Sequence, residues 1–552
     1  MEWGVNRVRG WRADMGFRSG QIEPDPAPVA SAPRDCRAVA GSPLGPDRSH
    51  VLTAVEAIAL AAVLLVGFAI RAGAILTQTY VVFADETFQY LEQAHRLAFG
   101  AGVVPWEYHD GVRSWLVPGV GAALMRLAAV FGDDPLIYLR LIRLCCAGLS
   151  LAVVYVGFRQ GLRIGGLAAA ILTGGFCAIW FDLIWFAPAV LTEVLAAHCA
   201  LLGLWLADDR DDSDRRRLLM AGLCLGLAVC LRYQYGPALA AASLWQHRLC
   251  WARWRWLVTG GLAVVVPLAG LLDWVTWGAP FQSIWLNFIC NSLDGVSSAM
   301  GTEPLSFFPA YLTTTFRPAP VFVFLAVFGA TRAPALAIAA LGVVAVHMAV
   351  PHKEVRFIYL ALAILPVLIG LGAACVVQVV VDRVRAESMA WLGAPLLLLG
   401  GWASWFGATG QPLVERWDFN RGPVQAFLLA HRQPDLCGLG VQDMRVIDSG
   451  GYAYLHRDVP IYFSEFSPSV ALHGVRSNLR FSVERDGREV PQVEGGRFAG
   501  ASDRYNYLIA SDVVGQPGFV RVSCFDGVSY PGRSSTCLYR RAGTCGPDAT
   551  GR

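Results

Sequence analysis

The sequence predicts an all-α, polytopic membrane protein with a C-terminal extracytoplasmic domain of β-rich or mixed structure. Three observations support this fold class. Of the 552 residues, 55% are hydrophobic and 16% are charged, and the mean hydropathy is +0.46, whereas a soluble chain carries about 25% charge. Apolar stretches of about 20 residues, enough to cross a bilayer core about 30 Å thick, recur from residue 51 onward. From residue 411 the sequence turns polar, with short alternating runs.

The first 50 residues differ from all that follows. They are rich in Pro, Gly and Ala, hold seven Arg, and lack the apolar core and cleavage site of a signal peptide. We therefore expect residues 1–50 to form a disordered cytoplasmic tail.

Residues 51–410 hold the predicted membrane spans, about 11–13 in number. Basic loops stay on the cytoplasmic side, so the segments 208–217, 247–255 and 382–385 are expected inside. The segments 75–115, 274–316 and 351–356 and everything after about 407 are then expected outside. This orientation requires an odd number of crossings in 144–187, where we find two weak spans. The candidate spans lie near 51–70, 116–131, 137–157, 164–181, 188–206, 217–231, 234–246, 256–273, 318–331, 334–350, 357–381 and 389–406.

The C-terminal segment 411–552 reads as a domain of about 140 residues with alternating runs at 453–464, 505–510 and 519–525. Four of the 14 Cys lie in it, an even number compatible with two disulfides outside the cell, although their spacing indicates no pairing. The four are Cys437, Cys524, Cys537 and Cys545.

The formal charge of +3, from 45 basic and 42 acidic residues, excludes a nucleic-acid binder that works by electrostatic attraction. All the basic residues are Arg except Lys353. GC-rich codon usage would explain this ratio, and so would a site that requires an ammonium group at position 353.

Charged side chains gather in two of the expected outside loops. In the first loop, Asp85 and Glu86 precede Gln89, Glu92 and His95, whose spacing predicts one shared helix face. Acidic residues at a helix start are also common as simple capping charges. Further along the same loop come Trp106, Glu107, Tyr108, Arg113 and Ser114.

The late loop reads His352-Lys353-Glu354-Val355-Arg356-Phe357, between two apolar spans. Three potential cations on the outside oppose the usual charge distribution of membrane proteins. Their anionic partner is either Glu354, within a solvated loop of internal salt bridges, or a bound phosphate.

These motifs resemble glycosyltransferase family 22, the dolichol-phosphate-mannose-dependent α-mannosyltransferases with the GT-C membrane fold. The resemblance covers about 51–410 and rests on the first-loop motif and the HKE-x-RF signature of the late loop. Weaker similarities occur at 187–193, at Asp273, Phe281 and Asn287, and at Gly301-Thr302-x-Pro304. The chain has Phe83-Ala84 where the family usually has His-Pro, and its C-terminal domain matches only loosely. We expect a bacterial-type member in the inner (plasma) membrane, with its active site facing outside.

The resemblance implies mannosyl transfer from a polyprenyl-phosphate donor to an acceptor hydroxyl, with inversion of configuration. Asp85, or Glu86 as second choice, is the expected general base. The expected donor-phosphate ligands are His352, Lys353, Arg356 and Arg113. Sugar or acceptor binding, or bracing of the loop, is expected of Gln89, Glu92, His95, Trp106, Glu107 and Tyr108. We expect no metal and no cofactor, because cationic side chains can neutralise a single phosphate.

Three alternatives stay open on the sequence. A GT-C enzyme could move arabinose, glucose or aminoarabinose instead. A transporter or flippase of lipid-linked sugars would place charges near the bilayer midplane and often shows inverted repeats, neither of which we find. A membrane-anchored binding protein would leave a dozen spans unexplained. The acceptor could be a glycan, a glycolipid or a protein, and membrane lipid is an expected partner.

Overall fold

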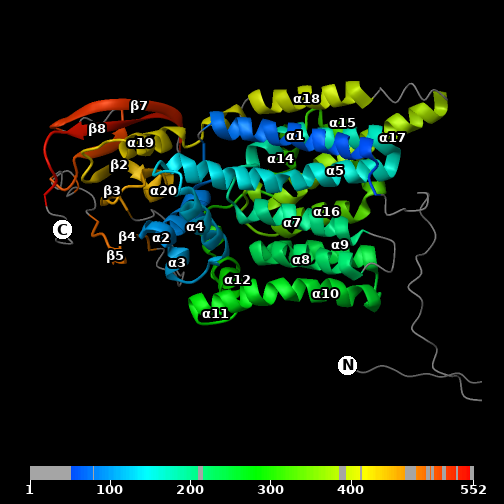
Figure 1. Cartoon of the computed structure of the whole chain (residues 1–552), viewed down its shortest axis with the longest axis horizontal. Helices are drawn as coiled ribbons and strands as arrows, with labels where there is room; N and C mark the ends of the chain where they lie inside the picture. The colour runs from blue at the N-terminus through cyan, green and yellow to red at the C-terminus, as the bar shows by residue number, and fades with distance from the viewer. Residues whose placement is uncertain are drawn as a thin grey trace, which may run out of the picture. The chain divides into compact units, whose positions relative to one another are not determined.

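The computed structural model describes residues 51–546 apart from 79, 82, 209–214, 385–392, 411–412, 467–479, 493–497, 499–502, 513–516 and 530–531. The expected tail at 1–50 lies outside the described residues. Most of the described chain is helical, and a sheet region follows the helices in chain order (Figure 1).

In chain order, a first group of helices spans residues 54–207 and a second group spans residues 215–409. The first group is α1 (Ala54–Thr77), the π-helix η1 (Glu86–Leu91), α2 (Glu92–Phe99), α3 (Trp106–His109), α4 (Leu116–Ala128), α5 (Pro135–Ile179), α6 (Phe181–Phe186) and α7 (Thr192–Ala207). The second group is α8 (Arg215–Leu231), η2 (Tyr233–Tyr235), α9 (Gly236–His247), α10 (Trp251–Val265), η3 (Val266–Leu271), α11 (Leu272–Trp277), α12 (Gln282–Phe288), η4 (Ile289–Leu293), α13 (Val296–Ala299), α14 (Phe307–Thr315), α15 (Ala319–Arg332), α16 (Pro334–Met348), η5 (Val355–Ile358), α17 (Tyr359–Val384) and α18 (Gly393–Thr409).

Several helices are long and apolar enough to cross a membrane. Four meet this condition among the described residues: α1, α5, the continuous stretch Trp251–Trp277, and the stretch Val355–Arg383. The pair α14 and α15, bent by 99°, would be a fifth. Three shorter apolar helices are α4, α7 and α16. The prediction of a polytopic helical membrane protein is confirmed, and the number of spans stays a prediction.

Helix α5 folds back on itself. Gly165 and Gly166 interrupt its helical backbone, and Gly166 has a φ of 67°, which favours glycine. Residues before the break lie against residues after it: Gly161 contacts the backbone of Ala169, and Gly157 contacts Thr173. The two halves of α5 therefore run antiparallel in close contact. The segment 144–187 therefore contains two antiparallel helical stretches, and the number of membrane crossings in it stays a prediction.

The predicted span at 116–131 corresponds to α4. This helix has 13 residues, about 20 Å in length, which is shorter than a bilayer core of about 30 Å. It packs on α2, where the guanidinium of Arg126 lies 5.4 Å from the ring centroid of Phe99. Just after α4, the Tyr138 hydroxyl donates to the Ala453 carbonyl of the C-terminal region at 2.5 Å. These contacts place α4 beside the first loop and the C-terminal region, and a membrane crossing at 116–131 stays a prediction.

The C-terminal region contains a mixed five-stranded sheet in the order β3-β2-β6-β8-β7. Strand β2 is parallel to β3 and β6, whereas β6–β8 and β8–β7 are antiparallel. The predicted runs at 505–510 and 519–525 fall in strands, but 453–464 is partly helical because α20 occupies its start. The elements are η7 (Leu413–Asp418), α19 (Arg421–His431), β2 (Leu439–Arg445), η8 (Val446–Asp448), α20 (Gly451–Leu455), β3 (Ile461–Glu465), β6 (Tyr507–Ser511), β7 (Phe519–Ser529) and β8 (Gly532–Arg541).

A second sheet joins the first loop to the C-terminal region. Strand β1 (Ala101–Val104) pairs antiparallel with β4 (Ser482–Arg485), and β4 pairs with β5 (Arg488–Glu489). Two disulfides, Cys437–Cys545 and Cys524–Cys537, link the C-terminal segments. The two predicted disulfides are therefore present, and the sheet joins the first loop directly to the C-terminal region.

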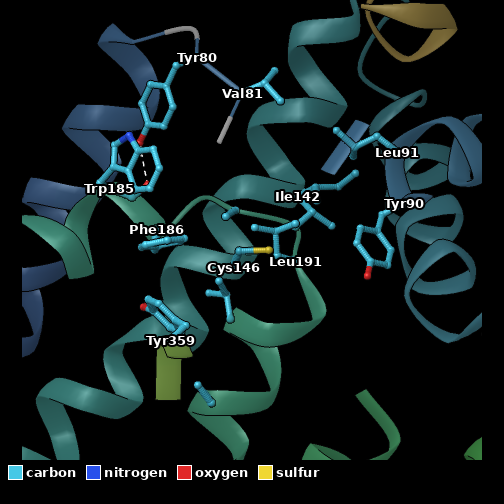
Figure 2. Close-up of a cluster of buried hydrophobic side chains, with 14 of the residues drawn as sticks. Tyr80, Val81, Tyr90, Leu91, Ile142, Cys146, Trp185, Phe186, Leu191 and Tyr359 are labelled. Carbon is cyan, nitrogen blue, oxygen red and sulfur yellow. Dashed lines mark hydrogen bonds between the residues drawn. The ribbon is translucent and has the colours of Figure 1, made fainter. Parts of the chain in front are cut away.

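The chain that leads into the first loop is anchored by a buried cluster. Figure 2 shows Tyr80 against Trp185, and the Tyr80 hydroxyl donates to the Trp185 carbonyl at 2.9 Å. Tyr90 and Leu91 of η1 belong to the same core as Phe186 and Tyr359. Burial of these large side chains fixes the start of the loop against α5, α6 and α17.

Candidate active site

The acidic motif of the first loop lies at the start of a π-helix. Asp85 caps η1, Glu86 begins it, and α2 follows without a break at Glu92. All six residues of η1 are buried. A single π-helical turn is often found at functional sites, and here it positions Asp85 at the end of a packed element.

The structure separates the two candidate bases. The Asp85 side chain is 26% exposed, and its Oδ2 lies 2.5 Å from Nη1 of Arg356. The Glu86 side chain is 1% exposed and lies 3.5 Å from Nη2 of Arg143. That same arginine nitrogen donates to the Tyr454 hydroxyl at 2.9 Å. Asp85 is thus accessible to a substrate, whereas Glu86 faces the protein interior.

An ion-pair chain connects the first loop to the helices. We define it as Asp85, Arg356, Glu193 and Arg232. Arg356 Nε lies 3.8 Å from Glu193 Oε1, and the same oxygen lies 3.3 Å from Arg232 Nη1. Arg356 also pairs with Glu354 at 2.8 Å and lies between the rings of Phe83 and Phe357. Alternating charges therefore extend from the exposed Asp85 to the end of α8.

A pocket adjoins the Arg232 end of the ion-pair chain. It is partly open to solvent. Arg113 contributes a second cation, and it interacts electrostatically with Tyr90, Glu107 and Asp85. The Nε atoms of Arg113 and Arg232 are buried and have no hydrogen-bond partner among the described residues. The polar residues of the lining are Tyr90, Arg113, Ser114, Thr192, Arg232, Tyr233, Gln234, Ser283 and Asn287.

The late-loop cations are held by internal partners. Lys353, 5% exposed, donates from Nζ to the carbonyls of Glu303 at 2.8 Å and Pro351 at 3.3 Å. His352 lies 2.8 Å from the Gly301 carbonyl and 3.0 Å from Glu354. The hydrogen bond to Glu354 raises the pKa of His352. The late loop and the 301–304 motif are therefore one structural unit.

Three more of the predicted site residues, Gln89, Glu107 and Tyr108, contact one another. Gln89 Nε2 donates to Glu107 Oε1 at 2.7 Å, and the Tyr108 hydroxyl donates to the Gln89 carbonyl at 2.8 Å. Burial raises the pKa of Glu107 to about 7. Trp106 is buried beside Val112 and Val296. These contacts favour bracing of the loop, and sugar binding by these residues stays a prediction.

Glu92 and His95 point away from this group, toward the C-terminal region. Glu92 accepts the N–H groups of Val103 at 2.6 Å and Ala453 at 2.5 Å. His95 Nδ1 lies 2.6 Å from the Ala101 carbonyl, and its Nε2 lies 2.9 Å from His456 Nδ1. Burial lowers the pKa of His95 to about 3, so this ring is neutral. Both residues thus connect the two parts of the chain, and their predicted sugar contacts stay a prediction.

The chain can now be compared with known proteins. Residues 62–408 match the model of one family, which is described as the Alg9-like mannosyltransferase family. This segment covers more than half of the chain and contains both loops of the candidate site. The chain belongs to the Alg9-like mannosyltransferase family. It is therefore a membrane glycosyltransferase, and the resemblance inferred from the two motifs is confirmed.

Relatives of this mannosyltransferase include GPI mannosyltransferase 3 of Yarrowia lipolytica, which is 28% identical over 74% of this chain and 78% of that protein. GPI alpha-1,2-mannosyltransferase 3 of Xenopus laevis is 26% identical over 55% of this chain and 58% of its own length. The crystal structure of ArnT from Cupriavidus metallidurans, bound to undecaprenyl phosphate, is 16% identical and matches 90% of this chain and all of that one, with a TM-score of 0.56. This structural similarity confirms the GT-C fold.

The sequence analysis of this mannosyltransferase missed Arg232 and gave Glu193 little weight. Glu193 lies in the first turn of the apolar helix α7, and Arg232 directly follows the apolar helix α8. Arg143, the partner of Glu86, lies inside an apolar stretch. Ionisable residues within or at the ends of membrane helices are a recognised sign of function, and this signal would have found all three.

One group of potential metal ligands occurs among the described residues: Asp512, Cys524 and Cys537. Its two sulfur atoms form a disulfide, so it does not fit a metal. The expectation that this mannosyltransferase needs no metal stays a prediction.

Proposed function

We propose that this mannosyltransferase transfers a mannosyl residue from a polyprenyl-phosphate donor to an acceptor hydroxyl on the outer face of the membrane, with inversion of configuration. The observation that carries the proposal is the ion-pair chain, which runs from the accessible Asp85 to a pocket with two arginines. Such a transfer needs a base at the hydroxyl and cations at the departing phosphate. Asp85, at one end of the ion-pair chain, would supply the base, and the arginines of the pocket at the other end would supply the cations.

Asp85 is the base in this proposal. It accepts the proton of the acceptor hydroxyl while that oxygen bonds to the anomeric carbon of mannose. The bond from this carbon to the phosphate oxygen breaks on the opposite side, which inverts the configuration. Glu86 is less suitable, because its side chain is 1% exposed and lies beside Arg143.

Arg113 and Arg232 are the cations that we assign to the donor phosphate. The phosphate gains one negative charge when the mannosyl group leaves, and both arginines carry a buried Nε without a hydrogen-bond partner among the described residues. Charge-assisted hydrogen bonds of this kind are strong. Phosphate binding by His352, Lys353 and Arg356 stays a prediction, and their internal partners favour a supporting role.

The orientation follows from charge and from the disulfides. Basic loops are expected on the cytoplasmic side, and the first loop shares its side with the C-terminal region through β1 and β4. The two disulfides of that region are typical of an oxidising compartment. Both arguments support a site on the outer face. The bacterial plasma membrane stays a prediction, since the named curated relatives come from eukaryotes.

The acceptor class is proposed from the relatives. Because two of them are named as GPI mannosyltransferases, a glycolipid is the acceptor to test first. A glycan and a protein are the alternatives.

The test is incubation of membranes containing the wild-type protein or Asp85→Asn with radiolabelled polyprenyl-phosphate mannose. We expect label in a lipid product with the wild type and a loss of at least a hundredfold with Asp85→Asn. The same assay with glucose, arabinose and aminoarabinose donors tests the sugar, and digestion of the product with an α-mannosidase tests the linkage. Full activity of a folded Asp85→Asn protein would overturn the role of Asp85. A labelled donor that crosses the membrane without transfer would support a flippase instead.

A further inference from the structure

The buried carboxylate of Glu92 lies between two distant parts of the chain. Its Oε2 accepts the N–H of Val103 in β1 at 2.6 Å, and its Oε1 accepts the N–H of Ala453 in α20 at 2.5 Å. The residue is fully buried. We call this group of three residues, together with Gly451, the Glu92 junction.

Both N–H groups depend on this carboxylate. Asp486 N donates to the Gly100 carbonyl, so residues 100 and 486 are a hydrogen-bonded pair of the β1–β4 ladder. Antiparallel pairs alternate, and Val103 with Val483 is therefore a non-hydrogen-bonded pair. The N–H of Val103 points away from β4 and needs an acceptor on its other side. Glu92 is that acceptor.

The C-terminal side of the junction is shaped around the carboxylate. Gly451 has a φ of 60°, a conformation that other residues rarely adopt. A Cβ at this position would lie 2.5 Å from Cδ of Glu92. Only glycine allows the start of α20 to approach the carboxylate so closely.

The junction also controls the element that carries Asp85. Glu92 is the first residue of α2 and follows η1 directly, and Asp85 caps η1. A shift of α2 would therefore move Asp85 relative to Arg356, with which it pairs at 2.5 Å. We propose that Glu92 is a positioning residue for mannosyl transfer, which couples the C-terminal sheet region to the helix that presents Asp85. This inference rests on the proposed role of Asp85.

Glutamine cannot replace the carboxylate at this position. Its amide offers one oxygen and one NH₂ group, so one of the two backbone N–H groups would face a donor instead of an acceptor. We expect Glu92→Gln to lower kcat at least tenfold and to change the donor KM less than threefold. Hydrogen exchange at 101–104 and 451–455 should become faster.

Glu484→Gln is the matched control. Glu484 belongs to the same β1–β4 sheet and pairs with Arg96 at 2.6 Å, but both side chains are partly exposed, at 26% and 20%. Such ion pairs contribute little. Glu484→Gln should therefore keep kcat within about twofold of the wild type. An equal loss in both variants would overturn the specific role of Glu92.

A covalent link across the same sheet tests whether positioning is the cause. Ala101 and Arg485 face each other as a non-hydrogen-bonded pair, whose Cα atoms lie about 4.5 Å apart in an antiparallel ladder, within disulfide range. In Glu92→Gln, the added pair Ala101→Cys and Arg485→Cys should restore most of kcat when oxidised. Glu92→Gln alone, given the same oxidation, should not recover.

Besides an equal loss in the control variant, three results would overturn the inference: wild-type kcat in Glu92→Gln, unchanged hydrogen exchange, or no rescue once mass spectrometry shows the disulfide. The failure of the proposed function looks different. The wild type would then show no mannosyl transfer, while hydrogen exchange in Glu92→Gln would still report the coupling.

Discussion

At the scale of single residues, the charges of the site are closely paired. Arg356 pairs with Asp85, Glu354 and Glu193, and two aromatic rings cover it. Phe83, which stands where family 22 usually has His, is one of these rings. The charge of Arg356 is thus largely compensated within the protein. Arg232 pairs with Glu193, but it and Arg113 each keep a buried Nε that has no hydrogen-bond partner among the described residues.

Arg113→Lys tests this assignment. The lysine keeps the charge but loses the Nε and the planar fork that suit a phosphate. We expect the donor KM to rise about tenfold, which corresponds to about 1.4 kcal/mol, with a smaller change in the acceptor KM. Arg480→Lys, in an exposed ion pair with Glu489, is the control. An unchanged donor KM would rule out contact between Arg113 and the donor.

Lys353, the one lysine of the chain, has a structural explanation in its two carbonyl partners. The wider guanidinium of Lys353→Arg would not fit between the carbonyls of Glu303 and Pro351, and an unsatisfied buried carbonyl costs about 1–3 kcal/mol. We expect this variant to unfold at a lower temperature and to keep its donor KM. A raised donor KM at unchanged stability would instead favour the predicted phosphate contact.

At the scale of elements, the sequence predicted a helix at the first loop but not the directions of its side chains. Gln89, Glu92 and His95 are spaced for one α-helical face, yet η1 is a π-helix that ends at Leu91. Gln89 therefore contacts Glu107, whereas Glu92 and His95 contact the C-terminal region. Hydrophobic periodicity carries no signal for the extra residue of a π-helical turn.

The spans show a similar division. Composition predicted the apolar stretches, but it did not predict the lengths of the helices or where they turn. Helix α4 is apolar but has only 13 residues, and the return within α5 depends on Gly165 and Gly166, whose role appears only in the backbone. Short-range patterns thus identified the elements and could not specify how they turn.

The Glu92 junction makes stability depend on pH. Burial raises the pKa of Glu92 from 4.5 to about 7. A raised pKa in the folded state means that ionisation of the buried group costs stability. The free energy of unfolding is highest below about pH 4.5, where Glu92 is protonated in both states, and it falls as the pH rises through about 7. A shift of this size corresponds to a change on the order of 3 kcal/mol in the free energy of unfolding.

Unfolding temperatures of the wild type and Glu92→Gln between pH 4 and 9 would measure this effect. The advantage of the wild type should shrink between about pH 4.5 and 7 and stay constant above about 8. Other titrating groups, such as Glu107 and His352, are common to both proteins and cancel in the difference. A difference that does not vary with pH would contradict the prediction.

At the scale of the whole molecule, the first loop and the C-terminal region form one structure. The family match ends at residue 408, yet β4, beyond that limit, completes the sheet of β1 in the first loop. Sequence analysis separated 51–410 from 411–552 by composition. Contacts between residues more than 350 positions apart, such as Glu92 with Ala453, leave no local pattern in the sequence.

This shared sheet gives a prediction for membrane topology. Asp110 of the first loop and Arg488 of β5 are exposed and must lie on the same side, whereas Arg216 belongs to the basic segment expected inside. We expect an impermeant maleimide to label Asp110→Cys and Arg488→Cys on intact cells, and Arg216→Cys only after permeabilisation. Labelling of Asp110→Cys and Arg488→Cys from opposite sides would contradict the β1–β4 pairing. Labelling of both only after permeabilisation would instead put the site on the cytoplasmic face, where the two disulfides would not persist.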